Sequence, residues 1–366
     1  MTTKIVALYL PQFYETEYNS RWWGEGYTDW VACKNAKPLF EGHRQPRIPL
    51  NQRYYDLSDT ESIKYQIELA REYGIDGFAI YHYYSVGKTL LDVPLELLKR
   101  DKDLNFPFYF FWANEAWRRT WYGNENELLW EQQYGNQAAW RQHYEYCREF
   151  FVLDHYMKIE GKPIFTIYKS WHFKDLNKFI AAWNQWAADD GFEGIYFVKA
   201  LGRKDDHELG SFNAVVTREP NYTFAFNETI SQKFMRVLSS NIRRTLNSEV
   251  FSKFLKKRVV FKVDYEKVWS KIIEKTPYSP HVFPGGFVDW DATPRKGFDA
   301  TIVTGSSPDL FRVYFEEMYN RARDAKCPMV VLNAWNEWGE GAYLEPDEEN
   351  KFKYLEAIRA VKKTKV

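Results

Sequence analysis

Short apolar runs alternate along the chain with longer amphipathic segments. The apolar runs predict strands at residues 5–10, 77–81, 106–111, 163–167, 194–198, 214–216, 281–283 and 328–332. Apolar positions three and four residues apart predict helices at residues 58–73, 90–100, 137–151, 174–188 and 351–363. Such an alternation is typical of repeated βα units, whose strands form a parallel sheet.

Eight predicted strands with intervening helices indicate the α/β class and a single (β/α)8 TIM-like barrel with loop insertions. The chain has 366 residues, of which 45% are hydrophobic, and this is enough for one large core. We therefore expect one barrel domain over residues 1–366. The pattern is least regular at residues 231–275, a basic stretch that predicts a helical insertion.

Two carboxylates follow the last predicted strand. Residues 333–341 have the sequence NAWNEWGEG, which sets Glu337 and Glu340 three residues apart among tryptophans and glycines. Breaking or making a glycosidic bond needs one carboxyl group at the leaving-group oxygen and a second that acts as base or nucleophile. Glu337 and Glu340 are therefore the predicted catalytic pair, with a pair of solvated loop glutamates as the plain alternative.

Aromatic residues make up 19% of the chain, and many lie beside polar residues rather than in apolar runs. Rings with flat apolar faces and polar edges suit a cleft that binds sugars. In a (β/α)8 barrel the active site lies at the carboxyl ends of the strands. The predicted substrate-binding residues at or near these ends are Trp23, Asp29, Trp30, His82, Tyr83, Trp112, Asn114, Glu115, Tyr168, Asn336, Trp338 and Glu345. For each of them, a place in the core, at the rim or in a loop ion pair is the alternative.

Charge, cysteine content and the N-terminal sequence narrow the class of protein. The formal net charge is zero, so nothing points to nucleic acid. The three cysteines, Cys33, Cys147 and Cys327, are too few and too widely spaced for a disulfide framework or a zinc cluster. No His-x-His or His-Glu-x-x-His pattern is present, so we expect no catalytic metal and no cofactor. The N-terminal apolar run is too short for a signal peptide, and no stretch could span a bilayer, so we expect a cytoplasmic protein.

Several segments, taken in order along the chain, resemble the WbsX family, which is named for glycosyltransferases of lipopolysaccharide O-antigen gene clusters. They are residues 21–30 (RWWGEGYTDW), 42–49 (GHRQPRIP), 73–78 (YGIDGF), 111–115 (FWANE) and 335–341 (WNEWGEG). The barrel of that family is similar to glycoside hydrolase family 99, the endo-α-mannosidases, whose site carries an Asn-Glu-Trp-x-Glu-Gly run. The resemblance implies a carbohydrate-active enzyme that acts on a bacterial surface polysaccharide or its precursor.

The resemblance to family 99 also implies roles for the two glutamates. Glu340 corresponds to the general acid and Glu337 to the base. In family 99 this base acts on the 2-hydroxyl of the sugar itself, which gives a 1,2-anhydro intermediate and net retention of configuration. A usual retaining enzyme would instead use one carboxylate as the nucleophile.

Two other functions stay open at the level of the sequence. The first is a nucleotide-sugar glycosyltransferase, for which Asp289 and Asp291 form a short Asp-x-Asp pattern that could hold Mg²⁺ and a diphosphate. The chain has no Gly-rich phosphate loop of recognised form. The second is a carbohydrate-binding barrel without activity. The basic segment at residues 253–262 is either a solvated helix face or a peripheral contact with an anionic membrane surface.

Overall fold

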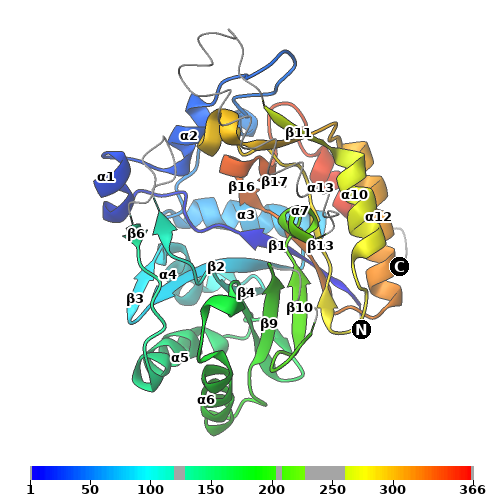
Figure 1. The fold of residues 1–366 in the computed structure, drawn as a ribbon. Coiled ribbons are helices and arrows are strands. Elements are labelled where there is room, and N and C mark those ends of the chain that lie inside the picture. The colour runs from blue at the N-terminus through cyan, green and yellow to red at the C-terminus, as the bar shows by residue number, and fades with distance from the viewer. Residues whose placement is uncertain (1, 119–127, 203–207, 227–259, 364–366) are drawn as a thin grey trace.

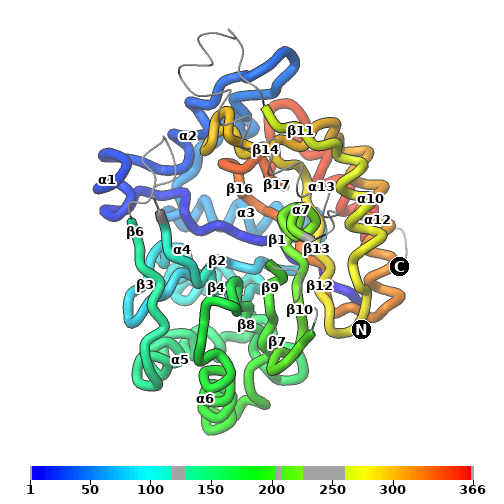
Figure 2. Tube along the Cα trace, in the orientation of Figure 1, coloured from blue at the N-terminus to red at the C-terminus, as the bar shows by residue number. Residues whose placement is uncertain are grey.

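A computed structural model of the protein describes residues 2–118, 128–202, 208–226 and 260–363 (Figure 1). Its centre is a curved parallel sheet. The strands β2, β4, β8, β9 and β10 follow one another on one side of β1, and β15 pairs with β1 on its other side (Figure 2). Their bounds are β1 (Lys4–Tyr9), β2 (Gly77–Ser85), β4 (Phe108–Trp112), β8 (Lys162–Ile167), β9 (Tyr196–Leu201), β10 (Ala214–Thr217) and β15 (Met329–Asn333).

One chain segment joins the two edges of this sheet. Strand β12 (Val282–Phe283) pairs with β10, and β13 (Gly285–Phe287) pairs with β15, with only Pro284 between the two strands. The sheet is therefore a nearly closed barrel of nine parallel strands, which confirms the predicted α/β barrel. The strand predicted at residues 281–283 is the first half of this segment. Pro284 and the glycines after it lack the apolar pattern that would have predicted the second half.

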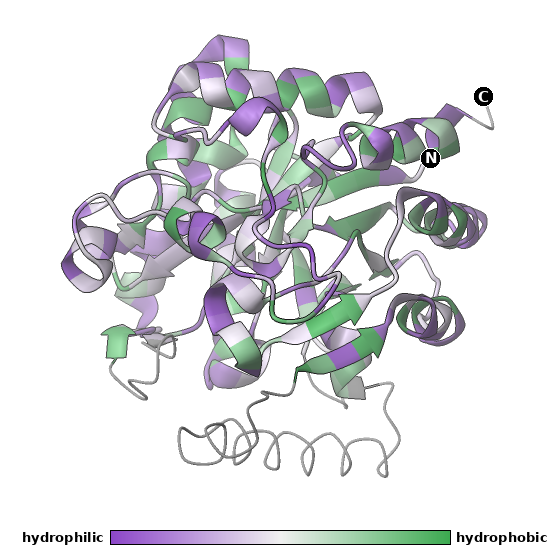
Figure 3. Ribbon diagram, turned by 90° about the horizontal axis from the view of Figure 1, so that it is seen from above, coloured by the Kyte–Doolittle hydropathy of each residue, from purple (hydrophilic) through white to green (hydrophobic). Residues whose placement is uncertain are grey.

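Helices surround the barrel and combine hydrophobic and hydrophilic residues along their length (Figure 3). Helix α3 shows how the sequence sets their ends. The Asp59 side chain accepts a hydrogen bond from the backbone N–H of Glu61, and Gly74 ends the helix in the left-handed conformation at a φ of 86°. The helices of six or more residues are α1 (Glu17–Trp23), α2 (Asp29–Asn35), α3 (Thr60–Tyr73), α4 (Val93–Arg100), α5 (Gln137–Phe151), α6 (Leu176–Asp189), α7 (Asn221–Phe226), α10 (Tyr265–Lys275), α12 (Pro308–Asp324) and α13 (Lys353–Lys363).

The predicted helices match α3, α4, α5, α6 and α13 to within a few residues. Helix α12 has no counterpart among the predictions, although its buried residues Phe311, Phe315 and Met318 follow a helical spacing and Ser307 caps its first turn. Helix α10 lies in the predicted basic insertion and packs against α12. The rest of that insertion, residues 231–259, lies outside the described residues. Within the described ranges, no helix combines the length and the apolar character needed to cross a bilayer.

Further short strands and turns lie outside the nine strands of the barrel. Two of them, β16 and β17, pair in antiparallel fashion directly after β15. The short elements are β3 (Lys88–Leu90), β5 (Trp117–Arg118), β6 (Leu128–Trp130), β7 (Lys158–Ile159), β11 (Phe261–Asp264), β14 (Thr301–Thr304), β16 (Asn336–Glu337), β17 (Ala342–Tyr343), the helix α11 (Thr293–Lys296) and the 3₁₀ turns η1 (Leu50–Gln52), η2 (Lys102–Leu104), η4 (Ser170–His172), η5 (Gly297–Asp299) and η6 (Trp338–Glu340).

Candidate active site

A cavity of about 430 Å³ opens at the carboxyl ends of the barrel strands. Strands β1, β4, β8 and β10 are each followed directly by a lining residue, β2 contributes Tyr81 and Tyr83, and the hairpin after β15 contributes the two glutamates, as expected for a barrel active site. The lining comprises Leu10, Gln12, Asn19, Trp23, Tyr27, Asp29, Tyr81, Tyr83, Leu91, Ala113, Glu115, Ala116, Trp117, Leu129, Tyr168, Arg218, Arg295, Glu337 and Glu340. Both predicted catalytic glutamates are therefore in the cavity wall.

A short hairpin presents the two glutamates. Glu337 is the last residue of β16, and Glu340 is the last residue of the turn η6, which connects β16 to β17. The Glu337 side chain is only 4% exposed, whereas that of Glu340 is 17% exposed. Glu337 thus lies in the floor of the cavity, and Glu340 lies closer to its opening.

The Arg295 guanidinium connects the two glutamates. Its Nη2 lies 2.8 Å from Oε1 of Glu337, and its Nη1 lies 3.6 Å from Oε1 of Glu340. Nη2 also donates to the carboxylate of Asp29, which accepts a second hydrogen bond from the Gln12 side chain. One buried arginine thus faces three carboxylates. It comes from α11, far from the glutamates in sequence, and the only sequence signal for it is its place in the segment that contains Asp289 and Asp291.

Gly339 makes room for this arginine. A Cβ at this position would lie 2.5 Å from Nε and 2.8 Å from Cζ of Arg295, closer than side chains tolerate. The glycine between the two glutamates therefore lets the guanidinium lie directly against the hairpin backbone.

Burial, together with the nearby carboxylates of Glu340 and Asp29, raises the pKa of Glu337 to about 8 against the opposing positive charge of Arg295. Glu337 therefore carries a proton for much of the time at neutral pH. A carboxyl group with a pKa near the working pH can exchange a proton with a substrate in either direction.

Five of the predicted substrate-binding residues line the cavity: Trp23, Asp29, Tyr83, Glu115 and Tyr168. The rings of Trp23 and Tyr27 stack with centroids 5.6 Å apart. Glu115 forms an ion pair with Lys169, which follows Tyr168 in the chain. The placement of these five side chains agrees with the prediction that they contact substrate, which stays a prediction.

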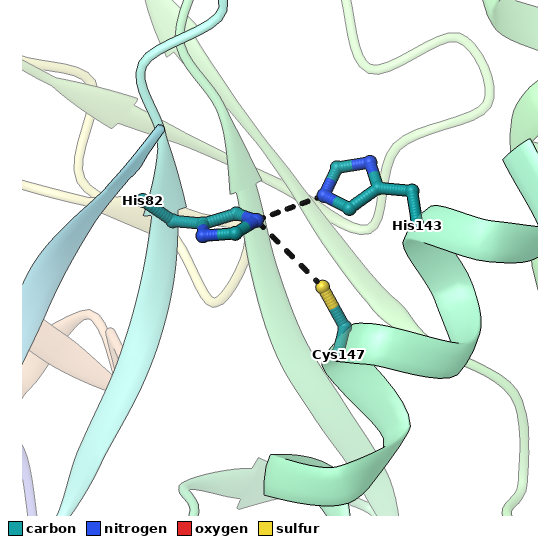
Figure 4. A group of neighbouring side chains, drawn as sticks. All are labelled: His82, His143 and Cys147. Atoms are coloured by element: carbon teal, nitrogen blue, oxygen red, sulfur yellow. Dashed lines mark hydrogen bonds between the residues drawn. The ribbon is translucent and has the colours of Figure 1, made fainter. Parts of the chain in front are cut away.

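The His82 side chain points away from the cavity, because successive side chains of a strand point to opposite faces. Tyr81 and Tyr83 point into it, so the residue between them lies on the outer face of β2, against α5. There Nε2 of His82 lies 2.9 Å from Nε2 of His143 and 3.9 Å from Sγ of Cys147 (Figure 4). Burial lowers the pKa of His82 to about 3, so the ring is neutral. These three are the only His, Cys, Asp or Glu side chains in the described ranges whose metal-binding atoms converge in a group, within 4.8 Å.

Asn336, Trp338 and Glu345 do not line the cavity, and their side chains support the hairpin instead. Asn336 accepts from the backbone N–H of Leu10 and donates to its carbonyl, which ties the hairpin to the end of β1. Trp338 donates to the Glu345 carboxylate at 2.6 Å. Glu345 also accepts hydrogen bonds from Tyr55 and Gln66, and burial raises its pKa to about 7. These contacts hold the loop that presents the glutamates.

Trp30, Trp112 and Asn114 likewise make structural contacts outside the lining. The indole N–H of Trp30 donates to the carbonyl of Tyr55, and that of Trp112 donates to the carbonyl of Tyr84. Asn114 exchanges hydrogen bonds with both the N–H and the carbonyl of Lys169, which joins the loops after β4 and β8.

The carboxylates of the Asp-x-Asp pattern already have protein partners. Asp289 pairs with Arg47 at 2.9 Å, and Asp291 accepts hydrogen bonds from His43 at 2.8 Å and Gln45 at 2.7 Å. Burial raises the pKa of Asp291, but these partners outweigh it and hold the value at about 2. Both aspartates thus bind side chains of the loop at residues 43–47. These contacts occupy carboxylate oxygens that a metal would need.

Solved structures with a similar fold include an endo-alpha-mannosidase and a protein described as glycoside hydrolase-like. An endo-alpha-mannosidase of family GH99 from Bacteroides thetaiotaomicron matches 98% of this chain and 96% of its own at 13% identity, with a TM-score of 0.53. A protein described as glycoside hydrolase-like matches 98% of this chain and 94% of its own at 14% identity, with a TM-score of 0.56. At these identities the likeness establishes the fold.

The sequence comparisons establish the family. The uncharacterized protein WxcX of Xanthomonas campestris pv. campestris (strain B100) is 31% identical over 364 residues, which are 97% of this chain and 49% of that protein. The chain thus spans about half the length of the curated relatives it matches. Residues 5–358 match the family described as Glycosyltransferase WbsX. The chain belongs to this WbsX family.

Proposed function

We propose that this barrel cleaves glycosidic bonds with retention of configuration, using Glu337 and Glu340 as its catalytic pair. The observation that carries the proposal is the convergence of both glutamates on Arg295 in a cavity walled by aromatic side chains. Two carboxyl groups that differ in burial and share one cation can hold different protonation states, which is what acid and base catalysis on a sugar requires.

The roles follow from burial and from the resemblance to family 99. Glu340, the more exposed of the two, gives its proton to the glycosidic oxygen as the leaving sugar departs. Glu337, in the floor, takes the proton of the 2-hydroxyl, and the 2-oxygen closes on the anomeric carbon to form a 1,2-anhydro sugar. Water then opens this ring, giving one proton to Glu340 while Glu337 returns its proton to the 2-oxygen. A raised pKa makes Glu337 the stronger base for this step.

The proposed substrate class is a bacterial surface polysaccharide or its precursor, as the resemblance to the WbsX family implies. Oligosaccharides with α-mannosidic linkages are the first substrates to test, because a protein of the same fold is an endo-alpha-mannosidase. The rings of Trp23, Tyr27 and Trp117 in the cavity wall provide faces on which sugar rings can stack.

Mass spectrometry of reaction products tests the proposal. The protein is incubated with α-mannan and O-antigen oligosaccharides, with and without nucleotide sugars and Mg²⁺. We expect shortened oligosaccharides in the absence of any nucleotide. A Glu145→Gln variant, which changes an exposed glutamate on the outer surface of α5 that pairs with Arg141, serves as the matched control and should retain cleavage.

Glycosyl transfer is the second candidate, and the family description favours it. In this reaction a sugar hydroxyl replaces water in the second step, and the same glutamate pair acts. Lengthened products that form only with a nucleotide sugar would establish transfer in place of hydrolysis. The pairing of Asp289 with Arg47 and of Asp291 with His43 supports hydrolysis over a metal-dependent transfer.

A further inference from the structure

Arg218 is a second arginine in the cavity wall, and its surroundings differ from those of Arg295. It directly follows β10, so it lies at the carboxyl end of a barrel strand and faces the cavity. Its Nε donates to the hydroxyl of Tyr81 at 2.9 Å, and its Nη1 donates to the hydroxyl of Tyr168 at 3.4 Å. Both partners are phenols, and burial raises the pKa of Tyr81, so that phenol stays neutral.

No acidic side chain neutralises this guanidinium. In the described part of the chain, no carboxylate oxygen lies within the 4.0 Å ion-pair distance of Arg218, whereas Arg295 has three carboxylate partners. An arginine keeps its proton under all ordinary conditions, and a desolvated cation is costly without an anion. Burial opposes the charge of Arg218, and the Glu340 carboxylate, which lies beyond ion-pair distance, raises the pKa of this arginine.

The free part of the guanidinium is its terminal edge. Tyr81 and Tyr168 occupy Nε and one N–H of Nη1, and Nη2 makes no hydrogen bond to a described residue. The remaining N–H groups of Nη1 and Nη2 form a planar fork that matches the two oxygens of a carboxylate or phosphate. The tyrosines fix the orientation of this fork toward the cavity.

We infer that Arg218 binds an oxyanion carried by the sugar substrate, in the subsite beside Glu340. The uncompensated charge, the fixed fork and the place in the cavity wall each favour an anionic substituent over a neutral hydroxyl. A hexuronic acid would supply a carboxylate, and a nucleotide sugar would supply a diphosphate. This inference rests on the proposed sugar site but not on whether cleavage or transfer takes place there.

Equilibrium binding separates this inference from the proposed reaction. Glucuronate, galacturonate and mannuronate are titrated by calorimetry, each against its neutral hexose, and uridine diphosphate is titrated separately. We expect at least one uronate to bind roughly tenfold or more tightly than its hexose, because a charge-assisted bidentate contact contributes about that factor. Arg218→Met should remove the preference and leave the weak binding of the hexose unchanged, and Arg218→Lys should restore part of it.

Arg141→Met is the matched control, because Arg141 pairs with Glu145 on the outer surface of α5. Binding of uridine diphosphate that depends on Arg218, without a uronate preference, would support the oxyanion site and identify its source as a diphosphate. The inference is overturned if no oxyanion binds in an Arg218-dependent way, or if Arg218→Met weakens hexose and uronate binding equally. None of these readouts needs turnover, so failure of the proposed reaction leaves them intact.

Discussion

At the scale of single residues, the central feature is the sharing of one guanidinium by Glu337, Glu340 and Asp29. The three carboxylates differ in exposure and in distance from Arg295, so they need not ionise together. Burial raises the pKa of Glu337 to about 8, which places its titration within the range where an enzyme works. The pH dependence of the reaction therefore reports on the protonation of this residue.

If Glu337 is the base, only its ionised form is active. Glu340 must hold a proton at the same time, so the active form is the singly protonated pair, and we expect kcat/KM to fall as pH rises through about 8, where the pair loses its last proton. Initial rates on a fixed oligosaccharide between pH 5 and roughly 9.5 measure this profile, with Glu145→Gln on the outer surface of α5 as a variant that should keep its shape. A rate that rises through pH 8 and then levels off would contradict a reaction that needs one proton on the pair.

The same pKa predicts how stability changes with pH. The folded-state pKa of Glu337 lies above its ordinary value of 4.5, so between these two values the folded protein binds more protons than the unfolded chain. Its contribution to stability is complete below pH 4.5 and declines as pH rises toward 8, by at most about 1.4 kcal/mol per pH unit for one group. Urea unfolding at several pH values should show a flatter dependence for Glu337→Gln. An unchanged slope would count against a raised pKa.

At the scale of elements, the β16–η6–β17 hairpin presents both glutamates, and contacts beneath it hold it in place. Asn336 ties it to the residue after β1, and Trp338 and Glu345 tie it to Gln66 of α3 and to Tyr55, which precedes α3. Most of the predicted substrate-binding residues that lie outside the cavity wall serve this kind of support. Polar and aromatic side chains near strand ends thus either line the cavity or support the loops around it, and sequence position alone does not distinguish the two groups.

Gly339→Ala tests the fit between the hairpin and Arg295. The new Cβ would lie 2.5 Å from Nε of Arg295 and would displace the guanidinium from both glutamates. We expect activity to fall by roughly tenfold or more, while the free energy of unfolding changes by about 1 kcal/mol or less. Gly191→Ala, at the end of α6, strains a backbone with a φ of 88° but has open space around it, so it should cost stability without affecting activity. Full activity of Gly339→Ala would show that the position of Arg295 is unimportant.

The sequence predicts which residues share one face of a strand or helix better than it predicts contacts between distant elements. Alternation along β2 could have placed His82 opposite Tyr81 and Tyr83, because successive side chains of a strand point to opposite faces. Arg218 follows the strand predicted at residues 214–216, so its place at the barrel opening could also have been predicted, whereas Arg295 comes from α11, whose contact with the hairpin no local pattern encodes. The glutamate pair was predictable because both members lie in one short segment after a recognisable strand.

At the scale of the whole molecule, the cavity exists because the barrel closes. The joining segment at Pro284 brings β10 and β15 together, so that Arg218 and the glutamate hairpin, which follow these strands, lie at the same opening. Gly285 is the tightest point of this junction, because a Cβ there would lie 1.7 Å from the carbonyl oxygen of Thr217. Backbone atoms cannot move aside as a flexible side chain can.

Gly285→Ala should therefore destabilise the whole barrel, by about 3 kcal/mol or more. Thermal and urea unfolding measure the loss, and Gly191→Ala provides the control for a glycine substitution away from the junction. A loss below about 1 kcal/mol would mean that the two edges of the sheet can separate at this point without cost to the fold.

The most direct test of the central claim compares Glu340→Gln and Glu337→Gln on two kinds of substrate. An oligosaccharide needs a proton at its leaving oxygen, whereas a glycosyl fluoride of the same sugar does not. We predict that Glu340→Gln loses activity on the oligosaccharide by roughly a hundredfold or more but keeps activity on the fluoride, and that Glu337→Gln loses both. Circular dichroism should show both variants folded. Full turnover of the oligosaccharide by Glu340→Gln would contradict the assignment of the catalytic pair.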